Sequence, residues 1–223
     1  MKSNVFKRYR NQFRSWLAIQ SILDEIDGEK FGEIAEKYNE DSPLPGSYSK
    51  YLDVRTWMKT YLDTYFDLDI DSRRQRRILD IGTGCGYFPF ICQYFGHEVM
   101  TLDTGDVAMY DDIIELLDIK RRDSRIEASK EIPSFGVKFD YVTAFMVCFN
   151  NHKLPNLWGA REWEFFLNDL AQSHTTEDGS VYLQLNMEFD GSFYDDELLD
   201  FFRSHGAEVE RECVYFSSMR AFR

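Results

Sequence analysis

Residues 78–95 decide the fold, and they read ILDIGTGCGYFPFICQYF. Residues 78–81 form a short apolar run with one acid, Asp80, which predicts a buried strand. Three glycines follow at every second position, where the backbone can turn sharply and approach a ligand without clashes from Cβ atoms. The residues from 87 to 95 predict a helix, whose first N–H groups can bind a carboxylate or a phosphate. The stretch therefore predicts a strand, a ligand-binding loop and a helix.

The spacing of the glycines indicates the class of ligand. A dinucleotide-binding loop has the form G-x-G-x-x-G, but the sixth position here is Tyr87, which disfavours a nicotinamide cofactor. The segment instead resembles motif I of class I S-adenosylmethionine-dependent methyltransferases, an acid followed by G-x-G-x-G, matched by Asp80, Gly82, Gly84 and Gly86. The resemblance implies a loop around the methionine part of S-adenosylmethionine, with Asp80 near its ammonium group. Two alternatives stay open: Asp80 caps the turn, or the loop is only a tight turn.

A second acid follows at the end of the next predicted strand, residues 98–102. Asp103 lies about 20 residues after the first glycine, where the resemblance places a carboxylate that holds both ribose hydroxyls. A carboxylate suits two adjacent hydroxyl donors because it only accepts hydrogen bonds. Ala128 and Ser129 stand where the family usually has an acid near the adenine. The remaining cofactor contacts that the resemblance implies are from Thr83, Thr104, Ala128, Ser129 and Phe145.

From residue 77 onward, short β-rich runs alternate with helical segments. This pattern predicts an α/β fold, a doubly wound, mostly parallel seven-stranded sheet. Strands are expected near 77–81, 98–102, 125–127, 141–145 and 180–185, with helices near 87–95, 110–117, 161–173 and 195–205. After Gly206, the runs 207–211 and 214–220 predict a C-terminal antiparallel strand pair at the sheet edge.

The first part of the chain has a different pattern. Residues 13–23 and 54–65 have helical apolar spacing, and the loop-like segment 41–49 between them carries prolines, serines and a glycine. We expect residues 1–71 to form an N-terminal helical cap and residues 72–223 to form a Rossmann-like methyltransferase domain. The two parts are expected to make one compact unit.

Composition limits the partners. The 223 residues carry a formal net charge of −13, which disfavours nucleic acid and an anionic membrane as partners, although a local basic patch could oppose the average. No apolar run is long enough to span a membrane, and the start does not resemble a secretory signal, so a cytoplasmic protein with a small-molecule substrate is expected. The four cysteines are far apart, without histidines at ligand spacing, and we expect no metal. The oligomeric state is left open.

The catalytic residues are less clearly indicated than the cofactor site. Methyl transfer is a direct displacement that needs alignment, and a base when the acceptor is a hydroxyl or an amine. His152, after the fourth predicted strand, is the candidate base because its proton affinity suits neutral pH; the alternative is an exposed loop histidine. Tyr48, Tyr51 and Trp158 could close over a ligand or fill the core. Two basic clusters, within residues 73–77 and 120–125, are left unassigned.

The sequence therefore predicts an S-adenosylmethionine-dependent methyltransferase that acts on a small-molecule acceptor by O- or N-methylation. One alternative keeps the fold and changes the reaction to another transfer, such as aminopropyl transfer from a decarboxylated cofactor. A third hypothesis is a non-catalytic binding module.

Overall fold

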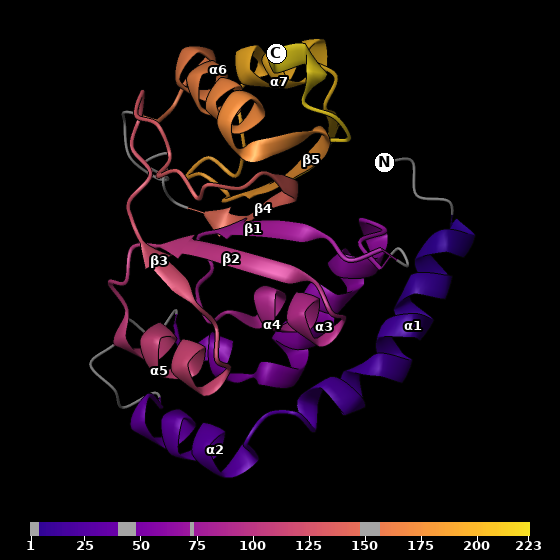
Figure 1. Cartoon of the computed structure of the whole chain (residues 1–223), viewed down its shortest axis with the longest axis vertical. Coiled ribbons are helices and arrows are strands. Elements are labelled where there is room, and N and C mark those ends of the chain that lie inside the picture. Colours follow the sequence, from indigo (N-terminus) through magenta and orange to yellow (C-terminus); the bar gives the residue numbers. More distant parts are fainter. Residues whose placement is uncertain (1–4, 40–47, 72–73, 148–156) are drawn as a thin grey trace.

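A seven-stranded sheet forms the centre of the protein, with helices on both faces (Figure 1). The computed structural model describes residues 5–39, 48–71, 74–147 and 157–223. The strands are β1 (Arg77–Ile81), β2 (Glu98–Asp103), β3 (Arg121–Asp123), β4 (Phe139–Val147), β5 (Thr175–Leu185), β6 (Glu208–Glu210) and β7 (Cys213–Phe216). Their order across the sheet is β3-β2-β1-β4-β5-β7-β6.

The strand directions confirm the predicted fold class. The strands β1 to β5 are parallel, β7 is antiparallel to β5, and β6 is antiparallel to β7. The C-terminal pair is therefore at the edge, as the two alternating runs after Gly206 predicted. Parallel strands are covered on both faces, and β1 shows this, since Leu79 and Ile81 enter one core and Ile78 the other.

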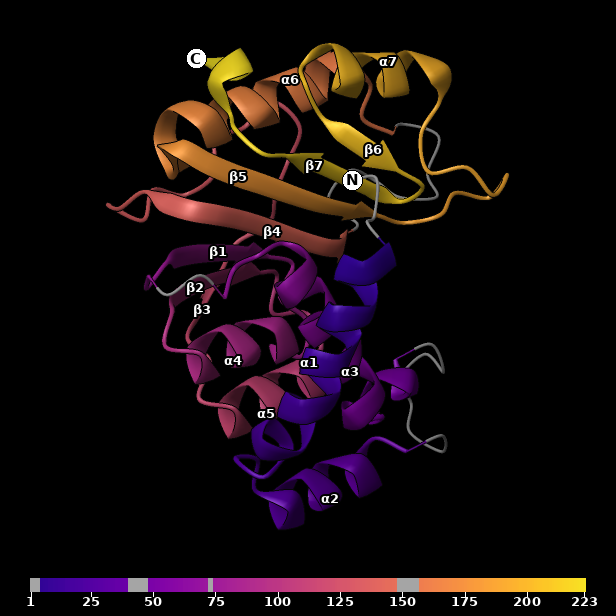
Figure 2. The ribbon, with the colours of Figure 1, turned by 90° about the vertical axis from the view of Figure 1, so that its right-hand side faces the viewer.

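Each face of the sheet has its own helical layer (Figures 1 and 2). The helices α6 (Ala160–Asp169) and α7 (Asp196–Ser204) cover one face and bury Trp163 and Phe202 there. The helices α3 (Val54–Asp67), α4 (Tyr87–Tyr94) and α5 (Ala108–Leu116) cover the other. The side chains of Met58 and Leu62 on α3 share a core with Ile91 on α4, so the N-terminal helices pack directly on the sheet layer.

The N-terminal part contains one helix that the sequence pattern did not predict. The predicted stretches 13–23 and 54–65 lie in α1 (Val5–Leu23) and α3, and between them is α2 (Gly28–Lys37). Asp27 caps α2 by accepting a hydrogen bond from the Lys30 N–H. The helix contains Gly28 and Gly32. Because glycine has a low helix propensity, the sequence pattern did not predict this helix.

Two strands start elsewhere than predicted, for reasons visible in the sheet. The strand β3 is Arg121–Asp123, so the expected strand at 125–127 is wrong. The strand β3 lies at the edge of the sheet and has no buried side chains. Ile126, within the expected strand, is buried in the loop after β3. The strand β5 begins at Thr175, before the predicted 180. Its pairing with β4 jumps from Thr175 to Ser180 while β4 advances only from Phe139 to Tyr141, so a bulge interrupts the alternation.

The helix predicted at residues 161–173 is not continuous. It is divided into α6 and a wider turn, Leu170–His174. Among the described residues, no helix combines the length and the apolar character that crossing a membrane requires.

The β5 bulge gives the first testable prediction. A Cβ atom at Gly179 would lie 2.9 Å from the Thr175 Cβ and 3.0 Å from the Phe139 carbonyl oxygen, which is backbone and cannot easily move. We expect Gly179→Ala to lower the free energy of unfolding by about 2 kcal/mol in denaturant titrations. Gly32→Ala is the matched control: a Cβ there meets nothing within 4 Å, so the helix should gain up to about 1 kcal/mol. Equal stability of the two variants would contradict the bulge geometry.

Candidate functional site

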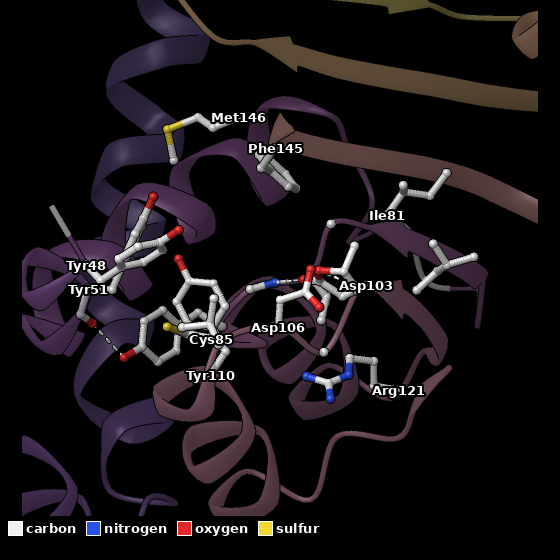
Figure 3. Close-up of a pocket in the computed structure, with 18 of the residues that line it drawn as sticks. Tyr48, Tyr51, Ile81, Cys85, Asp103, Asp106, Tyr110, Arg121, Phe145 and Met146 are labelled. Carbon is white, nitrogen blue, oxygen red and sulfur yellow. Dashed lines mark hydrogen bonds between the residues drawn. The ribbon is translucent and has the colours of Figure 1, made fainter. Parts of the chain in front are cut away.

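A pocket of about 460 Å³ opens at the carboxyl ends of the parallel strands (Figure 3). In doubly wound sheets, ligands bind at this edge. The loops after β1 and β2 supply Gly82 to Cys85 and Asp103 to Val107. The segment before α3 supplies Tyr48 and Tyr51 on the opposite side, so the N-terminal helical part and the sheet together enclose the pocket.

The glycine loop adopts a backbone that needs glycine. Gly82, Gly84 and Gly86 have φ angles of 70°, 52° and 74°, in the left-handed region that other residues rarely adopt. Gly82 and Gly84 line the pocket together with Thr83. Gly86 is not among the lining residues; a Cβ there would lie 3.2 Å from Ile119, so its glycine lets α4 begin close to the neighbouring chain.

Asp103 is held by backbone donors at the edge of the pocket. One carboxylate oxygen accepts a hydrogen bond from the Gly84 N–H at 2.7 Å, and the other accepts one from the Thr104 N–H at 2.6 Å. Asp103 and Thr104 both line the pocket. A carboxylate can accept about four hydrogen bonds, so two backbone donors leave capacity for two hydroxyl groups of a ligand.

Asp80 lies beneath the loop, outside the set of lining residues. Its carboxylate accepts a hydrogen bond of 2.6 Å from the Thr83 hydroxyl and another of 2.6 Å from the Thr143 hydroxyl on β4. The side chain is buried, and burial raises the pKa of Asp80 to about 7, although both hydroxyls act in the opposite direction. Asp80 therefore ties the loop to two strands, and its predicted contact with a cofactor ammonium group stays a prediction.

The raised pKa of Asp80 makes stability depend on pH. Between about pH 4 and pH 7 the folded protein holds a proton on Asp80 that the unfolded chain has released, so rising pH favours unfolding. As the pH rises from about 4 to about 7, the free energy of unfolding of the wild type should fall relative to that of Asp80→Asn, by up to about 1.4 kcal/mol per pH unit. Above this window the difference between the two proteins should stay constant. Denaturant titrations of both proteins measure the difference. A pH-independent difference would place the Asp80 pKa outside this window.

Tyrosines form the wall that faces Asp103. The rings of Tyr48 and Tyr51 contact the ring of Tyr110 edge-on, with centroids 5.7 and 5.8 Å apart, and Tyr61 also lines the pocket. Burial raises the pKa of Tyr61 and Tyr110, so their hydroxyls stay protonated. These groups can donate hydrogen bonds and present ring faces, but they cannot act as bases at neutral pH.

The ends of β4 and β5 close the pocket on another side. Phe145, a predicted site residue, lines it, and its ring lies 5.0 Å from that of Tyr61. The next residue, Met146, has a φ of +48°, and its carbonyl accepts a hydrogen bond of 2.6 Å from the Asn186 side chain. Such strained backbone is concentrated at functional sites. The sequence pattern did not single out Asn186, since one amide after a strand carries no motif.

Two residues that the sequence predicted as cofactor contacts, Ala128 and Ser129, do not line the pocket. Ser124, Arg125 and Ile126 line it after β3, whereas Ala128 and Ser129 are exposed and do not. The strand β3 ends earlier than the sequence pattern suggested, which leaves these two residues away from the pocket, and their contact with a cofactor stays a prediction.

Other sequence-based candidates have different positions. His152 lies outside the described residues, and its role stays a prediction. Trp158 is buried in the core that α6 covers, where its ring contacts the ring of Trp163. It is not among the residues that line the pocket. In the described part of the chain, no group of three metal-binding side chains comes together.

Arg121, from one of the basic clusters, supports the loop after β2. Its guanidinium pairs with Asp111 and Asp123, each at 2.7 Å, and only 13% of its side chain is exposed. A Cβ at Gly105 would lie 3.1 Å from this guanidinium. Arg121 thus lines the pocket as a fixed, paired cation.

Comparison with known proteins gives likenesses of structure. No protein-family model matches the sequence, and no curated protein matches it. Solved structures with a similar fold include S-adenosylmethionine-dependent methyltransferases. SAM-bound CalS10, an amino pentose methyltransferase from Micromonospora echinaspora involved in calicheamicin biosynthesis, is 19% identical, with 66% of this chain and 58% of that chain covered and a TM-score of 0.45.

Two other solved structures are alike to a similar degree. A TehB-like SAM-dependent methyltransferase from Corynebacterium glutamicum is 15% identical over 72% of this chain and 96% of that chain, with a TM-score of 0.46. DesVI of Streptomyces venezuelae is 15% identical over 57% of this chain, with a TM-score of 0.44. The match spans only half of the DesVI chain. The geometry of the pocket, and not these likenesses, carries the functional argument.

Proposed function

We propose that the chain is an S-adenosylmethionine-dependent methyltransferase that transfers the methyl group to an oxygen or a nitrogen of a small-molecule acceptor. The observation that carries this proposal is the carboxylate of Asp103, which the Gly84 N–H holds at the edge of the pocket. A fixed acid beside a glycine loop suits a nucleoside with two free ribose hydroxyls. The proposed cofactor-binding residues that line the pocket are Gly82, Thr83, Gly84, Asp103, Thr104 and Phe145.

The lining residues give each part of the cofactor a suitable environment. The ribose would bind Asp103, and the base would lie toward Ile126 and Ser124, where the loop after β3 adds an apolar and a polar contact. The methionine part would follow the loop toward Tyr110, whose ring would lie 3.8 Å from a Cβ atom at Gly84. Aromatic ring faces attract cations, so a tyrosine wall favours the positive sulfonium.

The proposed reaction needs little beyond alignment. A lone pair of the acceptor forms a bond to the methyl carbon while the carbon–sulfur bond breaks and its electrons stay on sulfur, which yields S-adenosylhomocysteine. The acceptor proton leaves to a base. Burial raises the pKa of the Cys85 thiol, and Asp80 is enclosed, so neither serves in this role. We propose His152 as the base.

A small-molecule acceptor agrees with the shape and charge of the site. A volume of about 460 Å³ lies within the usual range for small-molecule pockets. Lys50, near the tyrosines, lies with its ammonium 4.8 Å above the ring of Tyr51, so the acceptor side carries a cation and an aromatic surface. The net charge of −13 opposes nucleic acid as the acceptor.

Substitution of Asp103 tests the proposal. Asp103→Asn removes the charged acceptor of the ribose hydroxyls, and we expect the affinity for S-adenosylhomocysteine, measured by calorimetric titration, to fall by about 100-fold. Asp106→Asn is the matched control, because Asp106 also lines the pocket but pairs with Arg125 at an exposed position. It should change the affinity by no more than about twofold. Thermal unfolding of both variants confirms that they fold.

Three results would contradict the proposal. Absence of binding to the wild type would favour the non-catalytic module. Equal affinities of the wild type and Asp103→Asn for S-adenosylhomocysteine would show that the ribose does not bind Asp103. Tighter binding of decarboxylated S-adenosylmethionine than of S-adenosylmethionine would assign aminopropyl transfer instead.

A further inference from the structure

The inward side of the first helix, α1, carries polar residues in its first half and the apolar residues Ile19 and Ile22 in its second half. Asn11 and Ser15 are buried against α3, at 1% and 0% exposure. The Asn11 amide donates hydrogen bonds to the Phe66 carbonyl at 3.1 Å and to the Asp67 carboxylate at 2.9 Å, and the Ser15 hydroxyl donates to the Asn11 carbonyl. The two hydrogen bonds from the Asn11 side chain to α3 fix the rotation of α1 about its own axis. The side of α1 opposite Asn11 and Ser15 is therefore held outward.

The outward side of α1 is a stripe of large apolar residues. Tyr9, Phe13, Trp16 and Leu17 recur at helical spacing and are 68%, 58%, 65% and 57% exposed. The rings of Phe13 and Trp16 stack with centroids 5.9 Å apart. Figure 2 shows α1 along the outside of the helical layer. The exposed fractions of these four side chains place the apolar stripe on the solvent side of the helix. A contiguous exposed apolar stripe marks an interaction surface.

The charge of α1 is opposite to that of the chain. Its 19 residues include Lys7, Arg8, Arg10 and Arg14 and no acid, whereas the whole chain has a net charge of −13. Lys7 and Arg14 pair with Asp69 and Asp71. Arg10 is exposed, and its helical position is beside the apolar stripe. The helix is thus the local basic patch that the average charge conceals.

A groove of about 480 Å³ continues from the apolar stripe between α1 and α3. Leu17, Phe66 and Phe95 give it apolar walls. Arg14, which is paired with Asp71, and Arg74 place guanidinium groups in it. The Arg14 guanidinium lies 4.1 Å from the centre of the Phe66 ring. The groove therefore combines apolar surface with guanidinium groups, which bind phosphate well.

The one histidine in the groove adds no charge. Burial lowers the pKa of His97, its Nδ1 accepts a hydrogen bond from the Arg76 N–H, and its Nε2 faces the Tyr65 hydroxyl at 2.8 Å. A neutral ring satisfies both contacts. The cationic character of the groove therefore comes from its arginines.

These observations favour one occupant. A second copy of α1 would bring the exposed Arg8 and Arg10 against the same two cations, with no acid on either helix to pair with them. A lipid surface offers both complements, since Trp, Tyr and Phe suit the boundary between headgroups and acyl chains, and Lys and Arg suit anionic headgroups. We propose that α1 docks on a bilayer that contains anionic phospholipid, with the apolar stripe at the headgroup boundary and Arg10 and Arg74 facing phosphate.

Vesicle binding tests this docking. The full chain should sediment with vesicles of phosphatidylcholine and phosphatidylserine and not with phosphatidylcholine alone, and added salt should weaken the binding. Of the four tryptophans, Trp16 is exposed, Trp57 is half-buried, and Trp158 and Trp163 are buried. Tryptophan emission should therefore shift to shorter wavelength mainly through Trp16. Trp16→Phe should remove most of this shift and keep the binding, because phenylalanine retains the apolar contact.

Surface variants separate the apolar and the charged parts. The double variant Phe13→Gln, Trp16→Gln should lose at least about tenfold in vesicle affinity. Phe189→Gln is its matched control, since Phe189 is 82% exposed on a loop after β5. Arg10→Gln and Arg74→Gln should each cost about fivefold, and Arg203→Gln, an exposed cation on α7, should have no effect. All these side chains are exposed, so thermal unfolding should not change.

Three outcomes would overturn the proposal. They are absence of wild-type binding to the anionic vesicles, equal binding to both vesicle compositions, and unchanged binding of the double variant. A further result would assign the apolar stripe to contacts between copies of the chain. In it, the wild type self-associates in sedimentation velocity and does not bind vesicles, and the double variant abolishes the self-association. Binding of S-adenosylhomocysteine should be the same in all these variants, so the result is independent of the proposed methyl transfer.

Discussion

The hydrogen bond from the Gly84 N–H to the Asp103 carboxylate is the contact on which the site depends. It joins the loop after β1 to the end of β2 at 2.7 Å. The neighbouring bond from the Gly82 N–H to the Leu102 carbonyl, also 2.7 Å, extends the parallel ladder of β1 and β2 into the loop. The position of the loop is thus set by the sheet. A ligand that binds Asp103 is placed relative to the loop at the same time.

A second set of contacts supports the loop from below. Asp80 on β1 accepts hydrogen bonds from Thr83 in the loop and Thr143 on β4, so the loop is tied to β1 and β4. Burial of an acid costs stability, and the raised pKa of Asp80 is the sign of that cost. The benefit is a rigid loop, which a binding site needs if its donors and acceptors are to meet a ligand without rearrangement.

Local chemistry explains which parts of this structure could be predicted from the sequence. The glycine loop and β1 follow from the spacing of glycines and apolar residues along the chain. The choice of Asp103 follows from the resemblance to motif I of class I methyltransferases together with its place at the end of a predicted strand. The tyrosine wall could be predicted only in part. Tyr48 and Tyr51 are candidates from the sequence, but their meeting with Tyr110 depends on packing, and tyrosines are equally common in cores. The edge strand β3 and the bulge at Gly179 lack the buried alternation that marks a strand.

The most direct test of the account is a crystal structure of the chain with S-adenosylhomocysteine bound. The account predicts the ligand in the pocket at the carboxyl ends of β1 and β2, with both ribose hydroxyls donating to Asp103 and the sulfur directed toward the tyrosine wall. A ligand bound elsewhere, or a ribose turned away from Asp103, would contradict the central claim.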